Sequence, residues 1–198
     1  MLKIAITGKI ATGKTTISKI LKEMDYKVFD SDVEVANLYK TKPVINLVLE
    51  AFSHKISSLL LDNGKLNTSN LGQYVFKNTE ELIKLEKILY PELKKKKDYF
   101  YFENKKEKAL FYDIPLLFQK NLQSRYTHII LTIVNKETQK RRALQRKNMN
   151  KSKFENILKI QEYDEYKFKK KISLKLDTSK SIEETKKELK KFLKKIKI

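Results

Sequence analysis

The stretch LKIAITGKIATGKT, residues 2–15, decides the fold of this chain. Its first six residues are mostly apolar, which predicts a buried β-strand over residues 2–7. From Gly13 onward, apolar residues recur at helical spacing, which predicts a helix. Residues 8–15 between the two fit the pattern G-x-x-x-x-G-K-[ST] at every fixed position. This order of strand, loop and helix predicts a binding site for a nucleoside triphosphate.

Each fixed residue of this loop has a physical reason to be there. Gly8 and Gly13 let the backbone bend so that successive N–H groups point into one concavity, which binds anionic oxygens. The next helix directs its positive end at the same phosphates. Lys14 adds a positive charge near the β- and γ-phosphates, and Thr15 offers a hydroxyl ligand to Mg²⁺. The alternative is a glycine turn followed by a solvated lysine. We expect the following residues to bind the nucleotide: Gly8, Ala11, Thr12, Gly13, Lys14, Thr15 and Thr16.

The composition excludes several classes of protein. The 198 residues include no cysteine, which excludes disulfide frameworks, cysteine-ligated zinc, iron–sulfur clusters and a cysteine nucleophile. The two histidines, His54 and His128, are far apart in sequence, so we do not expect a histidine-based metal site. No apolar run approaches the roughly 20 residues that span a bilayer, and no secretory signal is evident. We therefore expect a cytoplasmic protein with no membrane partner.

The net charge of +20 has two interpretations. Only four of the 44 basic residues are arginine, whereas proteins that read nucleic acids favour the planar fork of arginine. The lysine excess accompanies many Ile and Asn residues, as an AT-rich genome would encode. We favour compositional drift and expect no specific nucleic-acid partner. A polyanion-binding surface is the alternative.

The rest of the chain alternates predicted strands and helices. Strands are predicted for residues 27–30, 109–112, 129–134 and 173–176. Helices are predicted for residues 32–39, 43–52, 69–106, 137–145, 154–166 and 181–196. This alternation is typical of an α/β fold with a parallel sheet flanked by helices. Within a single domain over 1–198, it predicts a core of residues 1–59 and 107–198 with a helical insertion at about 60–106.

Carboxylates follow two of the predicted strands. Asp30 and Asp32 come at the end of the second strand, and Asp113 ends the third. Ligands of parallel sheets bind beyond the carboxyl ends of the strands, so these side chains should face the phosphates. Asp32 is the candidate general base, and Asp113 is the candidate ligand of Mg²⁺, directly or through water. The alternatives are helix caps for Asp30 and Asp32 and a turn residue for Asp113.

Three of the four arginines lie within six positions, at 141, 142 and 146. Arg142 and Arg146 are four residues apart, which predicts that they share one helical face. Two guanidinium groups could hold the transferring phosphoryl group and offset its charge in the transition state. The alternative is a solvated basic helix.

These motifs resemble those of the bacterial dephospho-coenzyme A kinases. NGKLNTSNLGQYVFKNTEELIKLEKILYP is similar in layout to the helical substrate-binding insertion of that family. The other segments that carry the likeness are ITGKIATGKTT, FDSDVEVANLY, DIPLLFQK, ETQKRRALQRK and SLKLDTSKSIEET. The resemblance implies a P-loop nucleoside-kinase-like three-layer fold with a helical acceptor-binding insertion and a helical lid at about residues 136–168.

The resemblance also implies a reaction and its participants. The family transfers the γ-phosphate of ATP, with Mg²⁺, to the ribose 3′-hydroxyl of dephospho-CoA, the last step of CoA synthesis. It places the general base on Asp32, phosphate binding on the loop that contains Lys14, and lid contacts on Arg142 and Arg146. The expected partners are therefore ATP and dephospho-CoA, and the expected state is a monomer.

The chain departs from the family pattern at several positions. Lys9 and Ala11 replace two loop glycines, and we expect Ala11 to avoid a positive φ. Further departures are Thr68, Tyr90, Gln119 and Ser173. Two alternatives remain open: a P-loop kinase that acts on a nucleoside or nucleoside monophosphate, and a non-catalytic homologue that binds polyanions.

Overall fold

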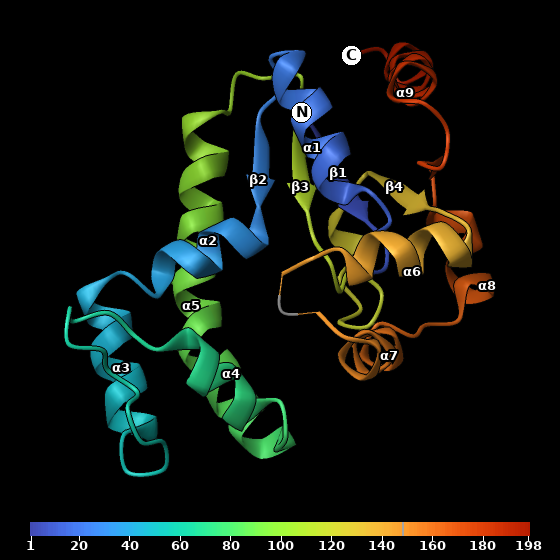
Figure 1. Cartoon of the computed structure of the whole chain (residues 1–198). Helices are drawn as coiled ribbons and strands as arrows, with labels where there is room; N and C mark the ends of the chain where they lie inside the picture. Colours follow the sequence, from blue (N-terminus) through green and yellow to red (C-terminus); the bar gives the residue numbers. More distant parts are fainter. Residues whose placement is uncertain (148) are drawn as a thin grey trace. The chain divides into compact units, whose positions relative to one another are not determined.

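The computed structural model describes residues 1–147 and 149–198, and these contain a five-stranded sheet (Figure 1). Neighbouring strands are parallel, in the order β2-β3-β1-β4-β5. The strands are β1 (Leu2–Thr7), β2 (Val28–Asp30), β3 (Ala109–Asp113), β4 (His128–Ile133) and β5 (Leu174–Asp177). The predicted α/β class is confirmed, and each strand lies within one residue of its predicted bounds.

The described residues pack into two compact parts. The sheet part comprises Met1–Asp30 and Asn104–Ile198, and the helical part is Ser31–Glu103. The helical part begins earlier than the insertion predicted at about residues 60–106. It does so because the helices over residues 31–52 share one hydrophobic core with the later helices.

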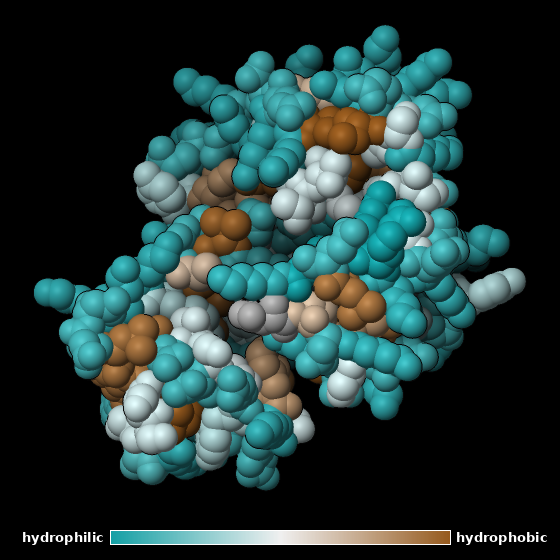
Figure 2. All heavy atoms as spheres, viewed as in Figure 1, coloured by the Kyte–Doolittle hydropathy of each residue, from teal (hydrophilic) through white to brown (hydrophobic). Residues whose placement is uncertain are grey.

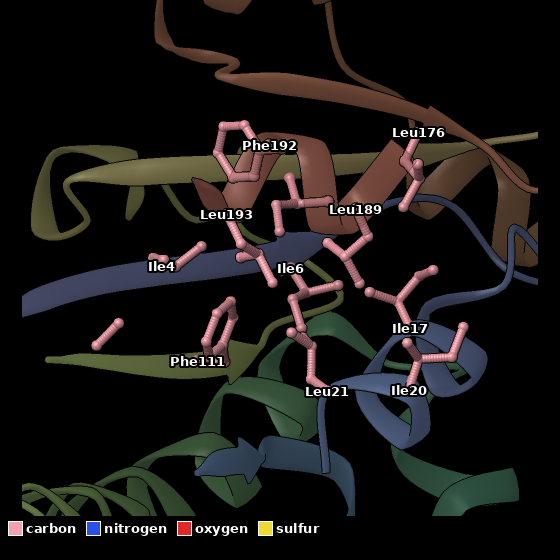
Figure 3. Packing of buried hydrophobic residues seen from close by; sticks show 12 residues of the cluster. Ile4, Ile6, Ile17, Ile20, Leu21, Phe111, Leu176, Leu189, Phe192 and Leu193 are labelled. Carbon is pink, nitrogen blue, oxygen red and sulfur yellow. The ribbon is translucent and has the colours of Figure 1, made fainter. Parts of the chain in front are cut away.

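The sheet part has β1 at its centre. Ile4 and Ile6 of β1 point to one face of the sheet, where they pack against α1 (Lys14–Glu23) and α9 (Ile182–Lys195), as Figure 3 shows. Ala5, on the opposite face, is fully buried as well. A strand that is buried on both faces is typical of a parallel sheet. This packing fixes the position of the carboxyl end of β1, where the loop over residues 8–13 begins.

Among the described residues, three α-helices lie between β4 and β5. They are α6 (Lys136–Leu144), α7 (Lys151–Ile160) and α8 (Glu165–Phe168). The prediction of one helix over residues 154–166 is wrong, because α7 ends at Ile160 and the chain turns before α8. In this turn the ring of Tyr163 packs on Phe118, with 4.8 Å between ring centroids. The contact holds the turn against the segment that follows β3.

The helical part consists of a helix pair before residue 60 and a second pair after it. Its helices are α2 (Ser31–Leu38), α3 (Lys42–Phe52), α4 (Thr68–Val75) and α5 (Thr79–Glu103). The stretch predicted as helical over 69–106 is thus divided into α4 and α5. The division falls at Asn78, whose side-chain oxygen accepts the backbone N–H groups of Glu80, at 2.9 Å, and Glu81, at 3.4 Å. Such a side-chain cap begins a new helix.

The face of the molecule seen in Figure 2 is mostly hydrophilic, as the net charge of +20 leads one to expect. Apolar residues appear on it only in separate patches. Within residues 1–147 and 149–198, none of the helices combines the length and the apolar character that crossing a membrane requires.

Candidate active site

The loop between β1 and α1 has a conformation that its two glycines make possible. Gly8 has φ +152° and Gly13 has φ +90°, so both lie in the region that favours glycine. A Cβ atom on Gly8 would lie 2.6 Å from the hydroxyl oxygen of Thr12 and would also meet Thr132. A Cβ atom on Gly13 would lie 2.8 Å from the hydroxyl oxygen of Thr178. The loop therefore excludes any side chain at either position.

Ala11 overturns one prediction. It has φ +60°, in the left-handed region, rather than the negative φ expected of alanine. The left-handed conformation costs an L-residue about 1–2 kcal/mol, and the surrounding contacts must offset that cost. Ala11 is buried and packs in a small apolar cluster with Ile10, Ala143 and Phe154.

Lys14 lies at the mouth of this loop. Its Nζ donates hydrogen bonds to the carbonyl oxygens of Gly8, at 2.8 Å, and of Lys9, at 3.3 Å. The ammonium group is thus held over the first turn of the loop. Thr15 and Thr16 follow in the first turn of α1, and both are exposed. The structure therefore brings a positive charge, the N-terminal end of a ten-residue helix and two hydroxyl groups together, which is an anion-binding arrangement.

Asp113 is the carboxylate that the sheet places beside this loop. It ends β3, where it is paired with Ile6 of β1, the residue two before Gly8. Its side chain is 5% exposed, and its Oδ2 accepts a hydrogen bond from the hydroxyl of Ser18 on α1, at 3.0 Å. Asp113 therefore lies at the carboxyl end of its strand, as predicted, and the structure adds that this strand is adjacent to β1.

The oxygen atoms in this region fit a hard cation such as Mg²⁺. Thr15 offers a hydroxyl group and Asp113 a carboxylate, and Mg²⁺ prefers oxygen ligands. Among the residues that the structure describes, no three His, Asp or Glu side chains form a group that could hold a metal. Mg²⁺ commonly takes one or two protein ligands and completes its shell with substrate phosphates and water. This donor set matches that mode of binding.

Two threonines that sequence reasoning missed support the loop from the neighbouring strands. Thr132 on β4 lies 2.8 Å, oxygen to oxygen, from the hydroxyl of Thr12. The hydroxyl of Thr178, which follows β5, donates to the carbonyl oxygen of Thr12 at 2.9 Å. Both threonines lie at carboxyl ends of strands, so the rule that pointed to Asp113 could also have pointed to them.

The two candidate lid arginines have different surroundings. Arg142 on α6 donates to Thr178 twice, from Nη1 to the hydroxyl at 3.0 Å and from Nη2 to the carbonyl at 2.8 Å. Arg146 is exposed and lies beyond the last residue of α6, Leu144, in a turn. The two arginines are therefore not on one continuous helix, contrary to the prediction from their spacing.

Asp30 and Asp32 belong to different parts of the molecule. Asp30 ends β2 and is paired with Asp113 at the carboxyl edge of the sheet. Asp32 is an exposed residue in the first turn of α2, the first helix of the helical part. The sheet part thus gathers Asp30, Asp113 and the phosphate loop, and Asp32 lies at the start of the helical part.

Comparisons with known proteins agree with these features. A family model described as dephospho-CoA kinase matches residues 2–184. The chain is 34% identical over 170 residues to the dephospho-CoA kinase of Fusobacterium nucleatum, with 84% of each chain covered.

Two solved structures have a similar fold along the whole chain. TT1252 from Thermus thermophilus is 25% identical with a TM-score of 0.78, covering 100% of this chain and 98% of that one. The dephospho-CoA kinase from Campylobacter jejuni is 25% identical with a TM-score of 0.67, covering 98% and 96%.

Proposed function

The chain belongs to the dephospho-CoA kinase family, and we propose that it transfers the γ-phosphoryl group of ATP to the ribose 3′-hydroxyl of dephospho-CoA. The products are ADP and CoA, and the reaction is the last step of CoA synthesis. In this transfer the bond from the γ-phosphorus to the β–γ bridging oxygen breaks. A new bond forms from the γ-phosphorus to the ribose 3′-oxygen, which loses its proton.

The phosphate loop binds and orients the triphosphate in this proposal. Backbone N–H groups over residues 8–16 and the N-terminal end of α1 receive the phosphate oxygens. Lys14, held at 2.8 Å from the Gly8 carbonyl, is close enough to exchange that contact for one to the β- and γ-phosphates. Its charge then offsets the negative charge of the departing phosphoryl group.

We assign Thr15 and Asp113 to Mg²⁺, which would neutralise charge on the β- and γ-phosphates when bound. Asp113 serves this role directly or through water, with its orientation maintained by Ser18. Asp30, its neighbour on β2, belongs to the same edge.

Asp32 is the general base in this proposal. A ribose hydroxyl is a poor nucleophile until its proton has an acceptor, and a positioned carboxylate supplies one. Asp32 is exposed and lies two residues after the carboxyl end of β2. We assign acceptor binding to the helical part over residues 31–103, and a role in transition-state stabilisation to Arg142 and Arg146 of the lid.

One observation supports this proposal most directly. The ammonium group of Lys14 and the N-terminal end of α1 lie at the same loop, whose conformation requires glycine at positions 8 and 13. The chain that contains this loop matches the family model over residues 2–184. The test is product analysis. The purified chain is incubated with Mg·ATP and dephospho-CoA, and the products are identified by mass spectrometry. We expect CoA and ADP in equal amounts.

The product assay also tests the alternative acceptors. Adenosine and AMP are offered in parallel, and ADP release with one of them but not with dephospho-CoA would contradict the assigned acceptor. Salt-dependent binding of RNA without any turnover of ATP would favour a polyanion-binding homologue instead. We also propose a cytoplasmic monomer, which gel filtration and cell fractionation test.

A further inference from the structure

The peptide groups on both sides of one loop residue, Ile10, are bound by two glutamine side chains. The Ile10 N–H donates to Oε1 of Gln161 at 2.5 Å. The Ile10 carbonyl accepts from Nε2 of Gln139 at 2.8 Å. Gln139 is a buried residue of α6, and Gln161 follows the last residue of α7. These glutamines are 129 and 151 residues from Ile10 in sequence, so the contacts are tertiary.

Gln161 is itself anchored to the sheet part. Its backbone carbonyl accepts a hydrogen bond from Nε2 of Gln119 at 2.7 Å. Gln119 comes directly after the buried Phe118, whose ring contacts Tyr163 two residues beyond Gln161. The Nζ of Lys9 lies 5.8 Å from the centroid of the Tyr163 ring, in a cation–π contact. The segment over residues 161–163 is therefore bound to two adjacent loop residues, Lys9 and Ile10.

These contacts matter because of the backbone conformation of the next residue, Ala11. Its φ of +60° is one that glycine adopts freely and alanine does not. Fixing the donor and acceptor of the preceding residue restricts the backbone that leads into this bend. Without the glutamines, Ala11 would be free to relax toward a negative φ, and the N–H groups after it would turn away from a common centre.

We propose that Gln161, together with Gln139, is a positioning residue that holds the phosphate loop in its binding conformation in spite of the alanine at position 11. The inference rests on the proposed function of the loop in binding phosphate. Neither glutamine needs to touch the substrate, because each acts through the backbone of Ile10. The contact to be tested is the acceptor oxygen of Gln161.

The test is the dissociation constant of Mg·ADP, measured by isothermal titration calorimetry with the full chain. Gln161→Met removes the acceptor and keeps the length and flexibility of the side chain. We expect it to raise the dissociation constant about tenfold, the size of one lost hydrogen bond. Gln161→Glu keeps an acceptor oxygen and should stay within about threefold of the wild type. Gln145→Met, at an exposed glutamine at the end of α6, is the matched control and should not change binding.

A second change distinguishes positioning of the loop from general support of the fold. In an Ala11→Gly background, the bend no longer depends on an external contact, because glycine populates positive φ readily. The loss caused by Gln161→Met should therefore shrink from about tenfold to less than about threefold. An equal loss in both backgrounds, or wild-type binding by Gln161→Met, would overturn the proposal.

Two further measurements cover a variant that does not fold and a wild type that does not make CoA. If circular dichroism shows that Gln161→Met does not fold, Gln139→Met is tested in the same two backgrounds with the same expectations. CoA formation by the wild type is assayed separately. A wild type that binds Mg·ADP but makes no CoA contradicts the proposed acceptor and leaves the glutamine comparison valid. A wild type that does not bind Mg·ADP overturns both proposals.

Discussion

Arg142 holds Thr178 with both ends of its guanidinium fork, at 3.0 Å to the hydroxyl and 2.8 Å to the carbonyl oxygen. The same hydroxyl donates to the carbonyl of Thr12 at 2.9 Å, and the Thr178 side chain fills the space beside Gly13. One threonine thus connects an arginine of α6 to the loop between β1 and α1. A single lysine ammonium cannot reproduce this planar, two-point contact.

Replacement of Arg142 should therefore reduce activity even when the charge is kept. We expect Arg142→Lys to lower kcat between about tenfold and a thousandfold, the range for removal of one charge stabiliser. Arg141→Lys is the matched control, since Arg141 is exposed on the same helix and the same charge is retained. Steady-state kinetics with varied ATP measures both variants. Equal kcat values for the two would show that the planar guanidinium group of Arg142 makes no contribution to catalysis.

Thr178 offers a separate check on this connection. Thr178→Val keeps the shape beside Gly13 and removes the hydroxyl group, so it should raise KM for ATP about tenfold. Thr178→Ser keeps the hydroxyl and should recover most of the affinity. If both variants behaved alike, the hydroxyl would have no part in holding the loop.

The sheet and the loop could be predicted from the sequence because both depend on patterns of neighbouring residues. A run such as residues 2–7 has the apolar character of a buried strand, and the fixed residues of the loop lie within eight positions. Asp113 was found by the same local logic, as an acid at the end of an apolar run.

The supporting contacts of the site follow no such pattern. The hydroxyl of Thr178 reaches a carbonyl 166 residues earlier, and Gln161 reaches Ile10 across 151 residues. Their partners are fixed only by the packed sheet. The positive φ of Ala11 could not be predicted for the same reason, since local propensity opposes it and tertiary contacts decide it. The turn at residues 161–164 was missed because aromatic packing on Phe118 overrides the helical spacing there.

The turn that carries Thr178 should respond to acid. The Asp177 carboxylate accepts the N–H of Ser179 at 2.9 Å and its hydroxyl at 2.7 Å, and these bonds hold the pKa of Asp177 below its usual value. A lowered pKa in the folded state means that the stabilisation is present above the pKa of the unfolded chain and is lost as pH falls through the folded value. Because Asp177 is only half-buried, solvent screens the effect.

We accordingly expect Asp177→Asn to lower the melting temperature by roughly 1–2 °C at pH 7. The difference from the wild type should shrink as pH falls below the ordinary pKa of an Asp carboxyl, and it should disappear once the carboxyl of the folded wild type is protonated too. Thermal melts by circular dichroism across this range measure it. A difference that stays constant with pH would mean that the charge of Asp177 contributes nothing.

Asp113 should govern the requirement for Mg²⁺. Asp113→Asn keeps an oxygen that can accept from Ser18 and removes the negative charge, so the fold should persist while metal affinity falls. We expect the Mg²⁺ concentration for half-maximal activity to rise about tenfold or more. Asp25→Asn is the control, at an exposed acid after α1. An unchanged Mg²⁺ titration would make Asp113 a structural partner of Ser18 only.

Lys14→Ala should abolish phosphoryl transfer with little loss of stability. The ammonium donates hydrogen bonds to the loop carbonyls of Gly8 and Lys9 and is not part of the hydrophobic core, so its removal should leave that core intact. We expect turnover to fall at least about a hundredfold, as for loss of a charge aimed at the developing transition state. Lys19→Ala, at an exposed lysine of α1, is the control. Near wild-type turnover of Lys14→Ala would show that Lys14 does not act on the phosphates.

Asp32→Asn tests the base. An amide of the same shape can still cap the first turn of α2 but cannot take the proton of a ribose hydroxyl, so single-turnover transfer should slow by about 10²–10⁴-fold. ATP affinity should stay nearly unchanged, because we assign nucleotide binding to the loop of the sheet part. Asp30→Asn is the comparison: Asp30 ends β2 beside Asp113, and its loss should alter the Mg²⁺ requirement more than the transfer step. Rapid-quench measurement with saturating Mg·ATP and dephospho-CoA gives the rate for each variant. Transfer by Asp32→Asn at the wild-type rate would show that Asp32 is a helix cap and that the proton has another acceptor.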